Sequence, residues 1–276
     1  MTRVRRLMKE NKFLMARRII QVAVLFFFFA GNSFGWNILK GNLSTARAFG
    51  ALPLSDPFGL LQVLAAGSLV SMEAIAGALL VALVYAVVGG RAFCSWICPL
   101  NIITDAANWL KKILRIDTAG EWSMSRASRY WIMALSLVIS ALLGVAAFEW
   151  ISPISMLHRG LIFGMGLGSL SVLAVFLFDL FLKKNGFCGH LCPLGGFYSA
   201  IATFSLIRVK HTRERCTLCM KCVDICPEQQ VLHRVGHRTG FILSGECVNC
   251  GRCIDVCEEG ALGFSNRLVS QKTSPI

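Results

Sequence analysis

The chain has 276 residues, of which 55% are hydrophobic and only 16% charged, and its mean hydropathy is +0.62. Soluble globular chains are nearer one quarter charged, so these values exclude an ordinary soluble protein as well as disorder, collagen and coiled coil, and they indicate a membrane protein. The formal net charge is +13 and there are 12 cysteines. The roles of both depend on where the charges and cysteines lie along the chain.

Four long stretches without basic residues predict membrane-spanning helices. They cover residues 19–39, 74–90, 130–148 and 160–182, and only the last is interrupted, by Asp179. A bilayer core of about 30 Å needs roughly 20 apolar residues as a helix, and lipid offers no partner to unpaired backbone groups. The first stretch is too long for a signal peptide and lacks its cleavage site, so we expect it to be retained. A shorter apolar segment, 59–72, predicts an interfacial or re-entrant helix after the Asp56-Pro57 turn.

The positive charge lies mostly in three segments. If the chain has four spans, all three lie on the same side of the membrane. Residues 1–18 carry seven Lys and Arg, residues 91–129 carry six and residues 183–276 carry twelve, together 25 of the 28. The positive-inside rule puts that side, with both termini, in the cytoplasm. Basic residues are not interleaved with aromatic ones in any soluble segment, so we expect no nucleic-acid partner.

An internal repeat surrounds two C-x3-C-P motifs. Phe93-Cys94-Ser-Trp-Ile-Cys98-Pro99-Leu100 matches Phe187-Cys188-Gly-His-Leu-Cys192-Pro193-Leu194, and each block follows a predicted hairpin of two spans. The i, i+4 spacing places both sulfurs of a pair on one helical face, and a repeat axis along the membrane normal brings the pairs together. Four soft ligands can hold a further iron–sulfur centre or another thiophilic metal, or can cycle as redox-active thiols. Both alternatives stay open, beside a simple packing role.

Two titratable residues near these motifs are weaker candidates for a catalytic role. Asp179 lies in an apolar stretch, where an ionisable group is costly and often functional. The alternative is that it pairs with Lys183 or Lys184. His190, between Cys188 and Cys192, can accept protons from a quinol, or can make a satisfied polar contact.

The C-terminal part carries eight cysteines in two runs. They are Cys216-x2-Cys219-x2-Cys222-x3-Cys226-Pro and Cys247-x2-Cys250-x2-Cys253-x3-Cys257. In paired runs of this kind three thiolates bind one [4Fe–4S] cluster and the fourth binds the other cluster. The runs therefore predict one cluster on Cys216, Cys219, Cys222 and Cys257, and a second on Cys247, Cys250, Cys253 and Cys226.

Disulfides and zinc are the alternatives for these eight residues. A reducing cytoplasm disfavours disulfides, and zinc sites use two C-x2-C pairs at a wider separation. One departure from the regular pattern is Glu258, which follows Cys257 where proline is more usual.

These patterns predict an all-α membrane bundle of four transmembrane helices in two repeated hairpins, plus a small C-terminal α+β ferredoxin-like domain. The expected organisation is a basic cytoplasmic arm (1–18), a membrane domain (19–207), a domain with two clusters (208–265) and a tail (266–276).

The chain resembles the membrane-bound ferredoxin-type proteins of the NapH/MauN group. The resemblance is carried by the two C-x3-C-P blocks, by Ile103-Thr-Asp105-Ala-Ala-Asn-Trp109-Leu after the first block, and by the paired cysteine runs. The blocks are most similar to NapH, the quinol dehydrogenase subunit of the periplasmic nitrate reductase system.

The resemblance implies that menaquinol or ubiquinol from the membrane pool is the electron donor. It implies a periplasmic ferredoxin-type or cytochrome subunit of the nitrate reductase system as the partner, with the eight C-terminal cysteines as cluster ligands. A different class of function, a maturation or reductive-activation factor for another redox enzyme, is the competing hypothesis.

Overall fold

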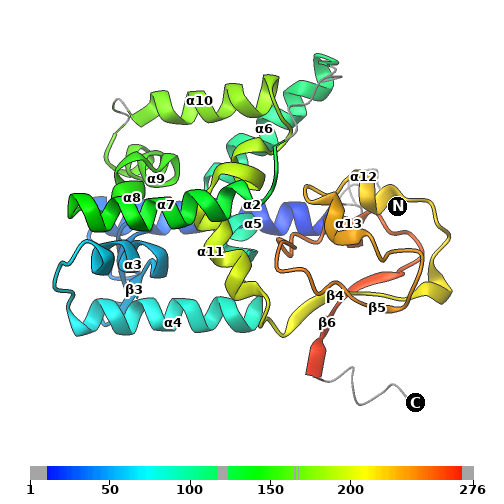
Figure 1. Cartoon of the computed structure of the whole chain (residues 1–276), viewed down its shortest axis with the longest axis horizontal. Helices are drawn as coiled ribbons and strands as arrows, with labels where there is room; N and C mark the ends of the chain where they lie inside the picture. The colour runs from blue at the N-terminus through cyan, green and yellow to red at the C-terminus, as the bar shows by residue number, and fades with distance from the viewer. Residues whose placement is uncertain (1–10, 117–123, 165, 167, 269–276) are drawn as a thin grey trace. The chain divides into compact units, whose positions relative to one another are not determined.

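The structure is a computed structural model that describes residues 11–116, 124–164, 166 and 168–268 (Figure 1). Most of the predicted basic arm and of the predicted tail therefore lie outside the described residues. The chain divides into two compact units. The cysteine-rich unit comprises Met1–Ile20, Val84–Ile97 and Tyr198–Ile276, and the helical unit comprises Gln21–Leu83 and Cys98–Phe197.

The expectation of four transmembrane helices is wrong for this structure. Among the described residues one helix is long and apolar enough to cross a membrane, the 22-residue α2 (Lys12–Ser33). The other apolar helices are α4 (Met72–Val88), α7 (Ser128–Leu143) and α10 (Gly168–Phe181), with 17, 16 and 14 residues.

Backbone breaks make these helices shorter than the apolar stretches that contain them. The first stretch runs to Leu39, but α2 ends at Ser33 and Leu39 begins a strand. The third stretch is divided between α7 and α8 (Ala147–Ile151). The fourth is divided between α9 (Pro153–Phe163) and α10, because Gly164 has φ +105°, a conformation that a residue without Cβ adopts most readily. Hydropathy locates apolar residues, whereas helix length depends on such breaks.

The helical unit contains a small antiparallel sheet in the order β1 (Leu39–Gly41), β2 (Thr45–Ala48) and β3 (Leu52–Ser55). Two short helices in this unit begin alike. In α3 (Pro57–Ala65) Asp56 is the N-cap, and in α9 Ser152 is the N-cap, and each is followed by a proline at the start of the helix. Such side chains accept hydrogen bonds from backbone N–H groups of the first turn. A helix is thus present in the apolar segment 59–72, but it begins at Pro57 and ends at Ala65. That this helix is interfacial or re-entrant stays a prediction.

Both C-x3-C-P motifs interrupt a helix and start another. The first motif contains the end of α5 (Ala92–Trp96) and precedes α6 (Leu100–Ile113). The second contains the π-helical η1 (Phe187–Leu191) and continues into α11 (Pro193–Ala202). The helix breaks at each proline because proline disfavours helical backbone in the residue before it, and π-helical turns are frequent at functional sites.

The cysteine-rich unit is built on a second antiparallel sheet, with β4 (Ile207–His211) between β5 (Gly240–Phe241) and β6 (Leu262–Asn266). Short helical segments connect the strands: η2 (Arg213–Arg215), α12 (Lys221–Asp224), η3 (Gln229–Leu232) and α13 (Arg252–Asp255). Its buried core is Val209, Cys222, Val231, Leu232, Val235, Ile242, Cys253 and Leu262. Two of these eight core residues are cysteines of the predicted clusters, so the core and the candidate metal sites coincide.

Candidate metal centres

The first candidate centre is a cavity in the cysteine-rich unit of about 220 Å³. Its lining contains the four cysteines predicted for the first cluster, Cys216, Cys219, Cys222 and Cys257. Cys222 is buried and Cys219 is exposed, so the cavity opens to the surface on one side. The structure therefore brings the last cysteine of the second run to the first three cysteines of the first run.

The second candidate centre is a smaller, more enclosed cavity in the same unit. It is lined by Cys226, Cys247, Cys250 and Cys253, together with the apolar side chains of Val209, Val231, Leu232 and Ile242. These four cysteines are the ones predicted for the second cluster. Cys250 and Cys253 are buried, whereas Cys226 and Cys247 are partly exposed.

Both runs have the same backbone, which explains how they wrap around a cavity. The second residue after the first cysteine is left-handed in each run (Leu218, φ 61°; Asn249, φ 47°). So is the residue after the second cysteine (Met220, φ 57°; Gly251, φ 74°), which caps the short helix with the third cysteine. The repeated turn directs consecutive cysteines into one cavity.

The donor sets fit iron–sulfur cubanes. Each thiolate of a cubane binds a different iron, so four sulfurs surround a volume rather than one ion. In the part of the chain that the structure describes, no three His, Cys, Asp or Glu side chains lie close enough to hold a single metal ion. The eight cysteines of the two runs also form no disulfide in the described chain. The ligand assignment itself remains a prediction.

Burial makes bare thiolates costly in the second cavity. It raises the pKa of Cys247 to about 11, and the nearby positive charges of Arg208 and Arg91 only partly oppose this. Burial also raises the pKa values of Cys226 and Cys253 well above the usual range of a thiol. A metal centre that binds thiolates compensates for this cost, and without one these side chains stay protonated.

Glu258, which departs from the regular pattern, has a local role at the first cavity. Its carboxylate forms an exposed ion pair with Lys221, with 2.9 Å between Lys221 Nζ and Glu258 Oε1. This hydrogen bond is the main cause that lowers the pKa of Glu258. Lys221 precedes Cys222 and Glu258 follows Cys257, so the pair connects the two chain segments that supply ligands to the first cavity.

The N-terminal end of α2 covers the second run. The backbone N–H of Phe13 donates to Asp255 Oδ2 at 3.0 Å, and the Phe13 ring lies edge-on to Phe264 with 5.3 Å between ring centroids. A Cβ at Gly251 would overlap the Phe13 ring. The close approach of Phe13 thus requires glycine here, whereas the equivalent left-handed position in the first run is occupied by Met220.

Gly251→Ala is expected to destabilise the second cluster site selectively. The left-handed backbone alone costs a residue with Cβ about 1–2 kcal/mol, and the overlap with Phe13 adds to this. We expect faster loss of iron from the purified variant in the presence of a chelator. Gly260→Ala is a matched control, because Gly260 also has a positive φ (63°) but a Cβ added there would meet no atom within 4 Å. Equal iron loss from both variants would contradict the role of the Phe13 contact.

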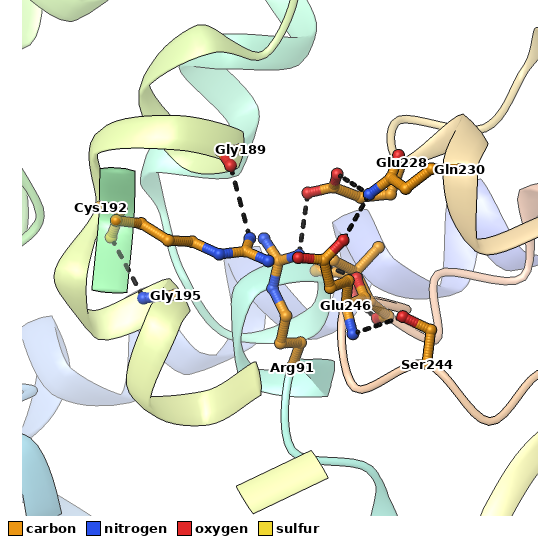
Figure 2. Close-up of polar contacts among 11 residues, drawn as sticks. Arg91, Gly189, Cys192, Gly195, Glu228, Gln230, Ser244 and Glu246 are labelled. Carbon is orange, nitrogen blue, oxygen red and sulfur yellow. Dashed lines mark hydrogen bonds and ion pairs between the residues drawn. The ribbon is translucent and has the colours of Figure 1, made fainter. Parts of the chain in front are cut away.

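The C-x3-C-P cysteines divide between the units. Cys94 lies in the cysteine-rich unit, and Cys98, Cys188 and Cys192 lie in the helical unit. Cys98 and Cys192, the second cysteines of their motifs, are equally buried, each with 4% of its surface exposed. Cys192 Sγ accepts a hydrogen bond from Gly195 N at 3.4 Å (Figure 2). That the four cysteines form one centre stays a prediction.

Asp179 and His190 both occupy buried positions beside the second motif. Asp179 is fully buried on α10, and its Oδ1 accepts a hydrogen bond from Phe187 N at 3.1 Å. It therefore holds the start of η1, the turn that carries Cys188. His190 lies on η1 with 3% of its surface exposed, and its backbone carbonyl accepts from Ser128 Oγ at 2.7 Å. Both residues thus contribute to the position of the second motif.

Sequence reasoning missed the charged residues around the second cavity. Arg91 and Glu228 form an ion pair at 2.8 Å with side chains 1% and 4% exposed. Gln230 Nε2 donates to carboxylate oxygens of Glu228 and Glu246 (Figure 2). The available signal was the position of Arg91 just before the first motif and of Glu228 just after Cys226-Pro227, but nothing in the sequence pairs them.

Comparison with known proteins agrees with the cysteine chemistry. A family model described as a 4Fe-4S binding domain matches residues 70–117 and 165–210, which include both C-x3-C-P motifs. A second model, described as a 4Fe-4S dicluster domain, matches residues 208–258. No solved structure matches the chain.

Several known sequences are similar over most of their length. The methylamine utilization ferredoxin-type protein MauN of Methylorubrum extorquens is 46% identical over 87% of this chain and 84% of its own. The ferredoxin-type protein NapH of Haemophilus influenzae is 43% identical over 93% of this chain and 91% of its own. NapH of Escherichia coli is 44% identical over 81% of this chain and 78% of its own.

Proposed function

The chain belongs to the family of NapH and MauN ferredoxin-type electron-transfer proteins with 4Fe-4S domains, and from this membership we propose that it oxidises quinol and passes the electrons toward a periplasmic nitrate reductase. The donor is menaquinol or ubiquinol of the membrane pool. The acceptor is a periplasmic ferredoxin-type or cytochrome subunit of the nitrate reductase system.

The observation that carries this proposal is the arrangement of the eight C-terminal cysteines. They line two cavities, four in each, in a chain whose relatives are ferredoxin-type proteins. Bound [4Fe–4S] clusters supply one-electron transfer at these positions. We assign Cys216, Cys219, Cys222 and Cys257 to one cluster and Cys226, Cys247, Cys250 and Cys253 to the other.

The C-x3-C-P cysteines are proposed to carry electrons between quinol and these clusters. The description of the family model that covers both motifs supports a further iron–sulfur centre more than a dithiol. Oxidation of one quinol releases two electrons and two protons. His190, on the buried turn η1 with Cys188, is the proposed acceptor of each proton in turn and passes the first to solvent before it takes the second. Asp179 holds that turn in place.

We propose a bacterial cytoplasmic membrane as the location, with multi-pass insertion and both termini in the cytoplasm. Exposed apolar side chains support contact with lipid: Ile19, Val22 and Phe26 on α2, Leu79 and Leu83 on α4, Trp131, Leu135 and Leu142 on α7, and Leu170, Leu173 and Phe181 on α10. Soluble proteins rarely expose so many large apolar residues on their helices.

Quinol-dependent nitrate reduction in membranes that lack only this protein tests the function. We expect the rate to fall to background with quinol as the donor, and to remain normal with an artificial donor that reduces the nitrate reductase directly. Reintroduction of the chain should restore the quinol-dependent rate. If the artificial donor is also ineffective, the nitrate reductase itself is inactive, and the chain acts as a maturation or reductive-activation factor.

Similarity to MauN supplies a specific reason to test whether the chain serves a redox enzyme other than nitrate reductase. MauN proteins are named for methylamine utilization and are as similar to this chain as the NapH proteins are. A normal rate of nitrate reduction with quinol in the deletion membranes would contradict the nitrate route and direct the search to another redox enzyme.

A further inference from the structure

The loop between the first two cysteines of the second run is held by side chains from α5. Ser95 Oγ donates to the carbonyl oxygen of Val248 at 2.7 Å, and Trp96 Nε1 donates to the carbonyl oxygen of Asn249 at 3.0 Å. Val248 and Asn249 are the two residues between Cys247 and Cys250. All of these residues belong to the cysteine-rich unit. The helix that carries Cys94 is therefore bonded directly to the ligand loop of the second cavity.

Arg91 extends this contact with a charge. Its guanidinium donates to the carbonyl oxygen of Glu246, the residue before Cys247, and pairs with Glu228, two residues after Cys226, both at 2.8 Å (Figure 2). Both partners of the ion pair are buried, so solvent screens their charges little. Arg91 thus contacts the chain beside both segments that supply cysteines to this cavity.

Aromatic packing fixes α5 itself. Phe93, next to Cys94, is stacked on Tyr198 with 5.0 Å between ring centroids, and Tyr85 lies edge-on to both rings. Ser95 is 1% exposed and Phe93 is 8% exposed. This packing holds the donor side chains of α5 in one place. A side chain can position a ligand loop only if it is itself fixed.

We propose that Arg91, Ser95 and Trp96 are positioning residues of the second cluster, and that Arg91 raises its reduction potential. The three side chains hold the Cys247–Cys250 loop by its carbonyl groups. Reduction adds one negative charge to a thiolate-bound cluster, and a buried positive charge nearby stabilises that state. The inference rests on the two clusters of the proposed function, but not on quinol or nitrate.

A second buried arginine near this cavity also favours a higher reduction potential of the second cluster. Arg208 is also buried, and it donates to the carbonyl oxygens of Ser244 and Ala202. Arg252, which lines the second cavity, is partly buried, whereas Arg215 and Lys221, which line the first cavity, are exposed. We therefore expect the second cluster to have the higher potential of the two.

Potentiometric titration followed by EPR on the intact, anaerobically purified protein tests the proposal. The second cluster's signal is identified as the one absent from Cys226→Ala protein. Arg91→Gln leaves Glu228 buried beside the cluster without its partner. We expect the ratio of its reduced to its oxidised form at a fixed potential to fall by at least tenfold, about 59 mV for one electron. Arg91→Lys, which keeps the charge, should restore most of the shift.

Two further variants and a control separate positioning from folding. Ser95→Ala and Trp96→Phe remove one hydrogen bond each, keep every charge, and should change the second cluster's EPR line shape but not the first cluster's. Arg234→Gln removes an exposed positive charge from the same unit and should shift neither potential. The proposal is overturned if both clusters are present and no variant changes the second cluster more than Arg234→Gln does. Loss of all iron already from the unaltered protein would instead refute the clusters of the proposed function.

Discussion

Replacement of Cys216 and Cys257 together by alanine is expected to remove about four irons per chain, whereas replacement of Cys216 and Cys226 together removes about eight. The reason is the crossed arrangement of the two cavities. Cys216 and Cys257 line the same cavity, but Cys226, from the same run as Cys216, lines the other. Iron and sulfide analysis of anaerobically purified protein measures the difference.

The two double variants control for each other, since they share Cys216→Ala and differ in one further cysteine. If each run held its own cluster, the result would be reversed, and Cys216 with Cys226 would cost only about four irons. Zinc in place of iron in the unaltered protein would refute the cluster assignment altogether.

Removal of both clusters is expected to unfold the cysteine-rich unit. Its buried core is small, and two of its eight residues, Cys222 and Cys253, are also predicted cluster ligands. A core of this size supplies little stability without a metal or another staple. We expect a chelator under reducing conditions to abolish the protease resistance of residues 208–268.

Replacement of Cys94 and Cys188 together by serine is expected to reduce quinol-dependent electron transfer to background, without loss of the irons bound by the C-terminal runs. Serine preserves the size of cysteine but is neither a soft ligand nor a redox-active thiol. Quinol oxidation measured beside iron content separates the two effects. Reduction of the C-terminal clusters by dithionite should be unchanged in this variant.

The serine variant shows whether Cys94 and Cys188 act chemically or only fill space. Serine and cysteine are similar in volume, so a purely structural role predicts nearly normal quinol oxidation in the serine variant. Normal activity would therefore make Cys94 and Cys188 packing residues. If the variant keeps the irons bound by the C-terminal runs but has less total iron than the unaltered protein, the missing iron identifies a further iron–sulfur centre at these motifs.

The cysteine pattern was readable because ligand spacing is local. Three ligands in C-x2-C-x2-C must lie within one turn, and the left-handed residues Leu218 and Asn249 show the same turn in both runs. Membership of the ferredoxin-type family likewise follows from short motifs such as Phe93–Leu100 and Phe187–Leu194. The break of the helix at Pro99 and Pro193 is a local consequence of the proline ring.

The number of long helices was not readable in the same way. Apolar composition continues through Gly164 and through the end of α2, but the helices do not. A hydropathy profile records the solvent preference of side chains. It contains no information on the single backbone angle at which a helix ends. The expected four spans therefore became one long apolar helix and several shorter ones in the described chain.

The sequence by itself predicted the chemistry of this protein: the eight ligand candidates, their crossed pairing and the role of the duplicated C-x3-C-P motif. Only the tertiary structure showed that Arg91 meets Glu228 and that Ser95 and Trp96 hold the Cys247–Cys250 loop. These partners lie far apart in the chain, at separations of 137 and 153 residues. A ligand motif is set by the reach of a few consecutive residues, whereas the charge around a cluster is set by whichever distant segments fold against it.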